Sequence, residues 1–155
     1  GATVEDRLFA TLDSKLRRGA LDPRTVAIFA DTVGFIRKLP HHLVASFKGT
    51  LEEITYADLV LHIVDRSHPR WREQQEVGCQ VLQELGVDPE RVITVFNKSD
   101  EVGETVRRRD GGLWLSALTG EGLDDLKGTI LDRLRQLPEV VAGELAVPPE
   151  RRATL

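Results

Sequence analysis

The sequence predicts an α/β fold in which helices cover both faces of a mostly parallel β-sheet. Short β-branched runs alternate with longer segments of helical spacing, the pattern of strands joined by crossover helices. The strand candidates are nearly continuous apolar runs, as expected where both faces of a sheet are covered. Since the chain has 155 residues, about the length of one domain, we expect a single three-layer arrangement.

Four apolar runs are the predicted strands, and three segments with apolar residues three and four positions apart are the predicted helices. The strands cover residues 25–30, 59–64, 92–96 and 113–115. The helices cover residues 41–55, 70–85 and 121–137. Gly86 and Pro138 follow the second and third helices, where these residue types commonly end a helix. We expect residues 1–138 to form one partial domain and residues 139–155 to be a linker or the start of a truncated segment.

Charge and composition exclude several classes of protein. With 25 acidic and 21 basic residues, the formal charge of −4 does not favour a general nucleic-acid binder. No apolar run approaches the roughly 20 residues that span a bilayer, and no leader-like segment opens the chain. The single cysteine, Cys79, cannot form an internal disulfide. We expect a cytoplasmic monomer without a membrane span.

Polar motifs follow three of the predicted strands, at the ends where ligands gather in open α/β sheets. They are Asp31-Thr32-Val33-Gly34, Asn97-Lys98-Ser99-Asp100 and Ser116-Ala117-Leu118. Each alone has an ordinary interpretation, because Asp-x-x-Gly is a common turn and Asn-Lys-x-Asp can be a solvated loop. All three together, in this order and each after a strand, indicate a guanine-nucleotide site.

The residue types in these motifs suit a guanine base. Asp100 can accept hydrogen bonds from both the ring N–H and the exocyclic amine of guanine, a pairing that adenine does not offer. Asn97 can donate to the acceptor edge of the purine and brace the neighbouring loops. The stem of Lys98 can lie over the base or ribose, and the backbone N–H groups after Ser116 can bind the guanine oxygen.

The first motif suits the phosphate end of the same ligand. Asp31 ends a strand, where a carboxylate can hold the hydration shell of magnesium. Gly34 lets its own amide approach a terminal phosphate.

Two longer stretches carry a family resemblance. They are Phe9-Ala10-Thr11-Leu12-Asp13 and the run DTVGFIRKLPH over residues 31–41. With the base motifs, they make the chain resemble the GTPase domain of the HflX family from about residue 3 to about residue 150. The resemblance implies a P-loop-type G domain that binds GTP or GDP with Mg²⁺, hydrolyses GTP to GDP and phosphate, and associates with the large (50S) ribosomal subunit.

The resemblance also implies roles for particular residues. Thr11, Asp31 and Gly34 would be catalytic, with Thr11 and Asp31 as ligands of magnesium. The nucleotide-binding set would be Phe9, Ala10, Thr11, Leu12, Asp13, Asp31, Thr32, Val33, Gly34, Asn97, Lys98, Ser99, Asp100, Ser116, Ala117 and Leu118. Phe35 stands where many G proteins have a glutamine that orients the attacking water, so slow intrinsic hydrolysis is expected.

One expected motif is absent from the sequence. A phosphate-binding loop requires Gly-x-x-x-x-Gly-Lys-Ser/Thr, and no lysine of this chain follows a glycine. In the family order this loop, the first strand and the first helix would lie upstream of residue 1. We therefore expect a G domain lacking these parts, with phosphate binding impaired in this chain alone. The alternative is a nucleotide-free interaction module that docks on the ribosome or on another protein.

Three other features have an ordinary interpretation. Residues 107–109 are three arginines that either meet RNA phosphates or form the solvated end of a helix. Asp65 ends a strand as a phosphoacceptor would, but nothing else in the chain supports that role. His62 lies inside an apolar strand and is expected to be a core or edge residue rather than a ligand.

Overall fold

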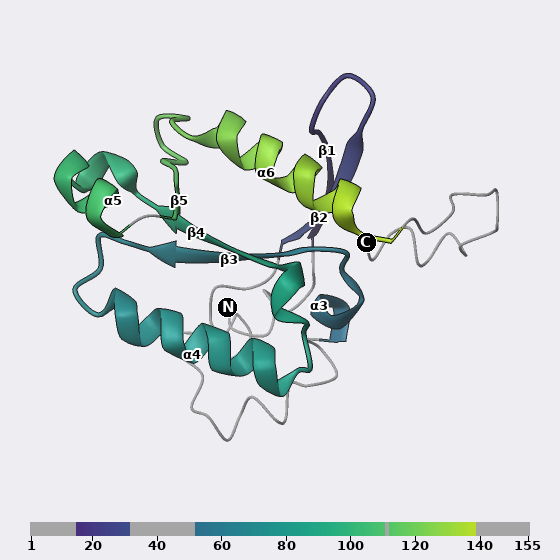
Figure 1. Ribbon diagram of the computed structural model, residues 1–155, viewed down its shortest axis with the longest axis horizontal. Helices are drawn as coiled ribbons and strands as arrows, with labels where there is room; N and C mark the ends of the chain where they lie inside the picture. The colour runs from purple at the N-terminus through teal and green to yellow at the C-terminus, as the bar shows by residue number, and fades with distance from the viewer. Residues whose placement is uncertain (1–14, 32–51, 111, 139–155) are drawn as a thin grey trace, which may run out of the picture. The chain divides into compact units, whose positions relative to one another are not determined.

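The computed structural model describes residues 15–31, 52–110 and 112–138 (Figure 1). The chain divides into two compact units, one formed by residues 1–57 and 140–155 and the other by residues 58–139.

The first unit contains an antiparallel hairpin. Its strands are β1 (Lys15–Ala20) and β2 (Val26–Asp31), paired from Lys15 opposite Asp31 to Ala20 opposite Val26. In the turn, the Leu21 amide donates to the Thr25 carbonyl oxygen over 2.9 Å. The strand β2 lies one residue beyond the prediction. The strand β1 was not predicted, because Lys15, two arginines and Gly19 do not form an apolar run.

A short helix, α3 (Glu52–Tyr56), completes the described part of this unit. Ile54, which belongs to the apolar stripe predicted for residues 41–55, is buried. The rest of that predicted helix, residues 41–51, lies outside the described residues.

The second unit is built on a three-stranded parallel sheet in the order β3-β4-β5. The strands are β3 (Val60–Asp65), β4 (Val92–Asn97) and β5 (Leu113–Trp114). Asp65 is in register with Asn97, and Phe96 with Trp114. All three predicted strands are confirmed to within one residue at each end, and their carboxyl ends lie at the same edge of the sheet.

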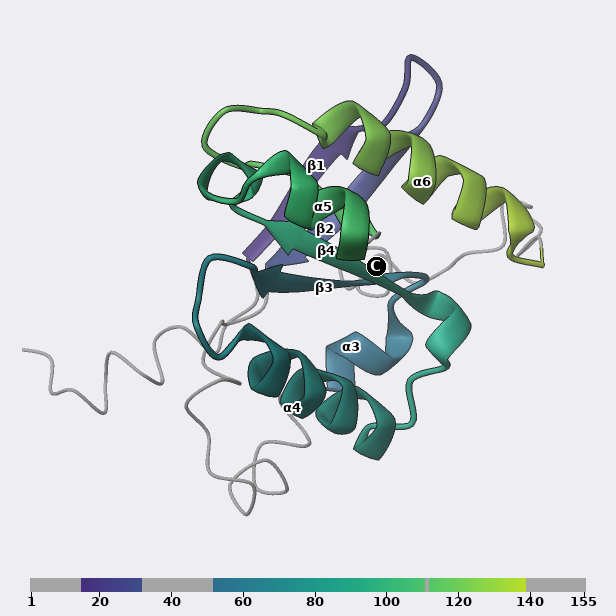
Figure 2. The ribbon, with the colours of Figure 1, turned by 60° about the vertical axis from the view of Figure 1, so that its left-hand side comes forward.

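Helices cover both faces of this sheet, as predicted. In both views α4 (Trp71–Glu84) and α6 (Leu123–Gln136) lie on opposite sides of the strands (Figures 1 and 2). Gly86, with φ of +75°, follows α4 in the left-handed conformation that favours glycine after a helix. A further helix, α5 (Glu104–Asp110), follows the turn after β4. The predicted α/β class with a parallel sheet is confirmed for this unit.

The core of the second unit lies on both sides of β4. Ile93 and Phe96 are buried, and Val95 is 0% exposed. The buried apolar residues of the flanking elements are Val64, Val81, Leu82, Leu115 and Ile130. Burying a side chain of this size stabilises a fold by roughly 1.5–3 kcal/mol before the entropy of ordering is counted. The central strand is therefore the most strongly held part of the sheet.

Aromatic rings extend this core toward the carboxyl ends of the strands. The Phe96 ring lies 5.8 Å from that of Trp71 and 5.1 Å from that of Trp114, measured between centroids. The buried guanidinium of Arg66 lies 3.8 Å from the centroid of Trp71. Such a stacked cation stabilises by roughly 0.5–2 kcal/mol. The two tryptophans thus pack within the unit.

His62 is half-buried and packs against α4. A Cβ added to Gly78 of α4 would lie 2.3 Å from the Nε2 atom of His62, so the helix approaches the strand closely because residue 78 has no side chain. Burial lowers the pKa of His62 below its ordinary value.

Among the helices of the described segments, none combines the length and the apolar character needed to cross a bilayer.

Candidate guanine-nucleotide site

The carboxyl ends of β3, β4 and β5 bring three polar segments together. Asp65 ends β3, Asn97 ends β4, and Ser116 lies two residues after the end of β5. The strands are parallel and hydrogen-bonded neighbours, so the loops that leave their carboxyl ends emerge at one edge.

Hydrogen bonds join two of these segments directly. The Oδ1 atom of Asn97 accepts a bond from the Ala117 amide over 3.1 Å. The Ser99 amide donates to the Leu115 carbonyl oxygen over 3.0 Å. The two motifs predicted to bind the guanine base are therefore adjacent and tied to one another, and Asn97 braces the neighbouring loop as predicted.

The side chains of these motifs divide into inward and outward sets. Ser99 and Ser116 are 0% exposed, and each anchors its loop in the unit. Asp100 is exposed, and Leu118 is 86% exposed. The carboxylate and the apolar side chain are thus accessible to a ligand at this edge, while the serines beside them serve the fold.

Lys98 is held in an unusual conformation. Its φ of 67° lies in the left-handed region, which costs an L-residue roughly 1–2 kcal/mol. Its Nζ atom lies 2.9 Å from Oδ2 of Asp65. This ion pair connects the end of β3 to the loop after β4, so it fixes the lysine stem at the candidate base site.

Asp65 is itself oriented by the next turn. Its Oδ1 atom accepts hydrogen bonds from the hydroxyl of Ser67 over 2.7 Å and from the Ser67 amide over 3.1 Å. Partial burial raises the pKa of the Asp65 carboxyl, but the bonds from Ser67 and Lys98 outweigh it and leave this pKa below its ordinary value. Asp65 is therefore a carboxylate at neutral pH.

The turn after β5 requires a glycine. The Ser116 carbonyl oxygen accepts from the Gly120 amide over 2.8 Å, and the Ser116 hydroxyl accepts from the Thr119 amide over 3.1 Å. Gly122, which precedes α6, has φ of +79°, and a Cβ there would lie 2.2 Å from the Trp114 carbonyl oxygen. Only glycine allows the chain to pass this close to β5.

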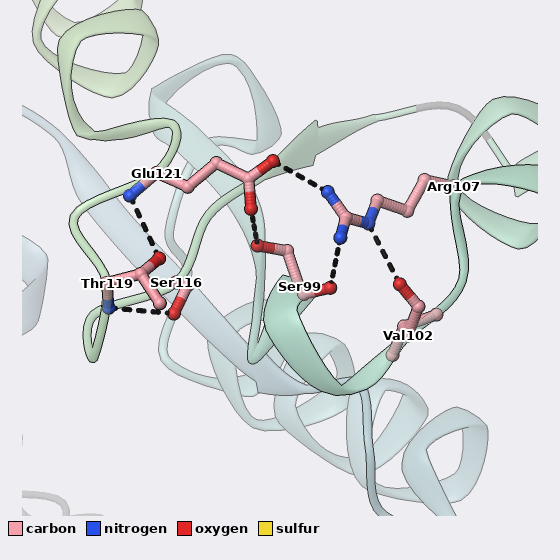
Figure 3. A network of polar contacts seen from close by, with 6 residues as sticks. All are labelled: Ser99, Val102, Arg107, Ser116, Thr119 and Glu121. Carbon is pink, nitrogen blue, oxygen red and sulfur yellow. Dashed lines mark hydrogen bonds and ion pairs between the residues drawn. The ribbon is translucent and has the colours of Figure 1, made fainter.

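A second network of hydrogen bonds and an ion pair also links these two loops (Figure 3). The Nη1 atom of Arg107 lies 2.8 Å from Oε1 of Glu121, and Oε2 of Glu121 accepts from the Ser99 hydroxyl over 3.0 Å. Arg107 also donates to the carbonyl oxygens of Ser99 and Val102. Arg107 is not the solvated helix end that the sequence favoured, because its guanidinium donates to three partners within the protein. A contact of residues 107–109 with RNA phosphates stays a prediction.

The charges of this network support one another. The hydrogen bond from Arg107, followed by that from Ser99, lowers the pKa of the Glu121 carboxyl below its ordinary value. Glu121 is therefore ionised at neutral pH, and its bonds to both partners are charge-assisted.

The phosphate side of the predicted site is described only at Asp31. This residue is exposed at the end of β2, in the first unit. The other predicted residues of this side lie outside the described residues: Phe9, Ala10, Thr11, Leu12, Asp13, Thr32, Val33 and Gly34. Within the described segments no group of three potential metal ligands gathers. The magnesium site with Thr11 and Asp31 stays a prediction.

Three residues were not connected with the candidate base loops in the sequence analysis. The sequence did contain a signal for Asp65. It ends β3, Asn97 ends the adjacent parallel strand β4, and Lys98 follows Asn97, so Asp65 and Lys98 are expected to lie close together. Arg107 and Glu121 gave none, because Arg107 lies in α5 and Glu121 lies 14 residues further on, in the loop between β5 and α6.

Similar proteins define the class and then the family. Residues 1–98 match the family model described as 50S ribosome-binding GTPase, which places the chain among GTPase domains. The GTPase HflX of Lacrimispora saccharolytica is 48% identical over 130 residues, covering 81% of this chain and 31% of the relative. That of Escherichia coli K12 is 40% identical over 152 residues, covering 94% and 35%. The chain belongs to the HflX family of GTPases, as the resemblance implied.

The same comparisons define what part of such proteins is present. The chain spans about a third of the length of these bacterial relatives. A crystal structure of a mutation variant of SsGBP matches with a TM-score of 0.63 and 24% identity, covering 83% of this chain and 50% of that one. At this identity the likeness supports the fold alone.

Proposed function

We propose that this chain supplies the base-recognising part of a GTPase that binds GTP with Mg²⁺ and hydrolyses it to GDP and phosphate by attack of water on the terminal phosphoryl group. The hydrogen bond between Asn97 and Ala117 supports the proposal most directly, because it ties the two base motifs to one another within the protein. A site organised in advance loses less entropy when its ligand binds.

The base fits the exposed side of these loops. The Asp100 carboxylate accepts the two N–H groups of guanine, and the Lys98 stem and the Leu118 side chain flank its two faces. The Ala117 amide donates to Asn97, and on binding it shares or exchanges that acceptor for the guanine oxygen. Asn97 is then released to face the purine edge.

The phosphates and magnesium are assigned to Thr11, Asp31 and Gly34, by resemblance to the family. Because these 155 residues contain no Gly-x-x-x-x-Gly-Lys-Ser/Thr motif, the chain by itself is expected to hold the β- and γ-phosphates weakly. Phe35 in place of a water-orienting glutamine implies slow intrinsic hydrolysis.

The partner of the whole protein is proposed from the family. The matching family model is named for binding to the 50S ribosomal subunit, and we extend this to the parent protein as a cytoplasmic monomer. Co-sedimentation of the parent with purified 50S subunits, compared with and without a non-hydrolysable GTP analogue, tests the association.

The base assignment is tested by Asp100→Asn in a version of the chain extended upstream to include a phosphate loop. An amide in place of the carboxylate can pair with xanthine but leaves one donor of guanine opposed by another donor. The affinity for GTP should fall roughly a hundredfold, and xanthosine triphosphate should become the preferred ligand. Competition against a fluorescent nucleotide measures both, with Asp124→Asn in α6 as the control. An unchanged preference for GTP removes Asp100 from this role.

A titration separates the enzyme from the interaction module. Fluorescent GTP is added to this chain and to the extended version. Micromolar binding in the extended version alone supports the proposed GTPase, and no binding in either supports a module that docks without nucleotide.

A further inference from the structure

We propose that Arg107 and Glu121 are positioning residues that set the selectivity of this site for guanine, by holding the loop of Asp100 at a fixed separation from the loop of Ala117. This proposal rests on the proposed function and adds to it two residues that never touch the nucleotide. It is based on the ion pair between Arg107 and Glu121 and the hydrogen bond between Glu121 and Ser99 (Figure 3).

Glu121 belongs to both loops at once. Its backbone carbonyl oxygen accepts from the Ser116 amide over 2.9 Å, which fixes it to the loop after β5. Its carboxylate accepts from the Ser99 hydroxyl over 3.0 Å, which fixes it to the loop after β4. A change in the Glu121 side chain therefore alters the distance between the loops rather than either loop alone.

Arg107 completes the bridge from the other side. Its Nε atom donates to the Val102 carbonyl oxygen over 3.0 Å, and Nη2 donates to that of Ser99. These two carbonyls flank the single turn of 3₁₀ helix that contains Asp100 (Ser99–Glu101). The planar guanidinium holds this turn at two points and Glu121 at a third, a geometry that the ammonium of a lysine cannot reproduce.

Ser99 connects the network to the selectivity for guanine, because the next residue is Asp100. Ser99 precedes Asp100 and is 0% exposed, so its hydroxyl and carbonyl face the network while the next side chain faces solvent. A paired hydrogen bond to the two N–H groups of guanine tolerates little displacement of the carboxylate. A displaced carboxylate weakens two hydrogen bonds to guanine but only one to hypoxanthine, so loosening the network should lower the preference for guanine.

The network should matter less for folding than for binding. The Glu121 side chain is 53% exposed, so neutralising it should cost little stability, whereas Arg107 is 21% exposed and also holds two backbone carbonyls. The selectivity for guanine, in contrast, depends on the separation between the loop of Asp100 and the loop of Ala117. These two measurements separate a positioning role from a merely structural one.

The test compares GDP with IDP, since inosine lacks only the exocyclic amine that Asp100 would read. In the full-length protein, Glu121→Gln and Arg107→Lys should each lower the preference for GDP over IDP by about tenfold, and Glu121→Gln should leave the urea midpoint nearly unchanged. Glu121→Gln added to Asp100→Asn should lower the preference no further, because the group it positions is gone. Arg70→Gln, which breaks an exposed arginine–glutamate pair at the start of α4, is the matched control and should have no effect.

Three results would count against the proposal. A preference for GDP that is unchanged in both variants would overturn it and leave the proposed function standing. Equal losses for GDP and IDP with a lowered urea midpoint would show a structural role and also overturn it. A wild-type protein that binds GDP and IDP equally would overturn the proposed guanine recognition, and this proposal with it.

Discussion

The two units of the chain hold their strands in different ways. In the unit of residues 58–139, β4 is buried between a helix on each face, and Val95 is 0% exposed. In the hairpin of the other unit, Leu16, Val26 and Phe29 are exposed although they lie in strands. Among the described residues, side-chain burial therefore stabilises the strands of the parallel sheet more than those of the hairpin, which are paired through their backbones from end to end.

The difference matters for the proposed site. The loops assigned to the base are anchored by buried serines and by hydrogen bonds to one another, as with Asn97 and Ala117. The residue assigned to magnesium, Asp31, stands exposed at the end of a hairpin strand. The loops proposed to bind the base are thus held in place by the fold, and substitutions in the two units test this distinction.

The largest effect is expected where the backbone itself is crowded. Gly122→Ala places a Cβ 2.2 Å from the Trp114 carbonyl oxygen at a φ of +79°. Overpacking and the left-handed conformation together should lower the free energy of unfolding by about 3 kcal/mol. Urea unfolding followed by tryptophan fluorescence measures it, since both tryptophans, Trp71 and Trp114, lie in the second unit.

Gly128→Ala is the control in the same helix. A Cβ at Gly128 meets nothing within 4 Å, and residue 128 lies in the interior of α6. Alanine should raise the free energy of unfolding by up to about 1 kcal/mol, through its higher helix propensity. Similar destabilisation by both substitutions would contradict the close approach at Gly122.

An intermediate effect compares one residue type in the two units. Val95→Ala removes two buried methyl groups from β4 and should cost about 2 kcal/mol. Val26→Ala removes them from a side chain that is 53% exposed and should cost less than about 0.5 kcal/mol. The tryptophan-monitored urea midpoint should shift for the first substitution only. Equal shifts would mean that the hairpin and the sheet unfold as one packed body.

Apolar runs decided which strands the sequence could predict, and they located β2 as well as the strands of the parallel sheet. The runs over residues 59–64 and 92–96 are apolar because their strands are covered on both faces, so pattern alone located β3 and β4. The strand β1 could not be found in this way, because its pairing with β2 depends on backbone hydrogen bonds that any side chain permits.

Some residues of the candidate site could be predicted from the sequence, and others could not. Asn97, Asp100 and Ser116 were predicted because their chemistry suits a base and each follows a recognisable strand. Arg107 and Glu121 were not, since an arginine in a charged run has no pattern that shows it turning inward. Their pairing depends on the path of the chain through α5, which becomes known only with the fold.

The smallest effect tests whether the base loop stores backbone strain at Lys98. Alanine and glycine both remove the ion pair with Asp65, so the difference between Lys98→Ala and Lys98→Gly isolates the backbone at φ of 67°. The left-handed conformation costs an L-residue roughly 1–2 kcal/mol, and the greater flexibility of unfolded glycine offsets roughly 0.5–1 kcal/mol of this. Lys98→Gly should therefore be the more stable variant by about 0.5–1 kcal/mol in tryptophan-monitored urea unfolding.

Glu76, exposed in the interior of α4, is the matched control site for this pair of substitutions. At helical dihedral angles the order should reverse, with Glu76→Ala more stable than Glu76→Gly by about 1 kcal/mol. If alanine is the more stable residue at both positions, Lys98 is not strained in solution. Opposite orders at the two positions would instead show that the loop holds Lys98 in a conformation it would not adopt alone, which is the preparation that distinguishes this unit from the hairpin.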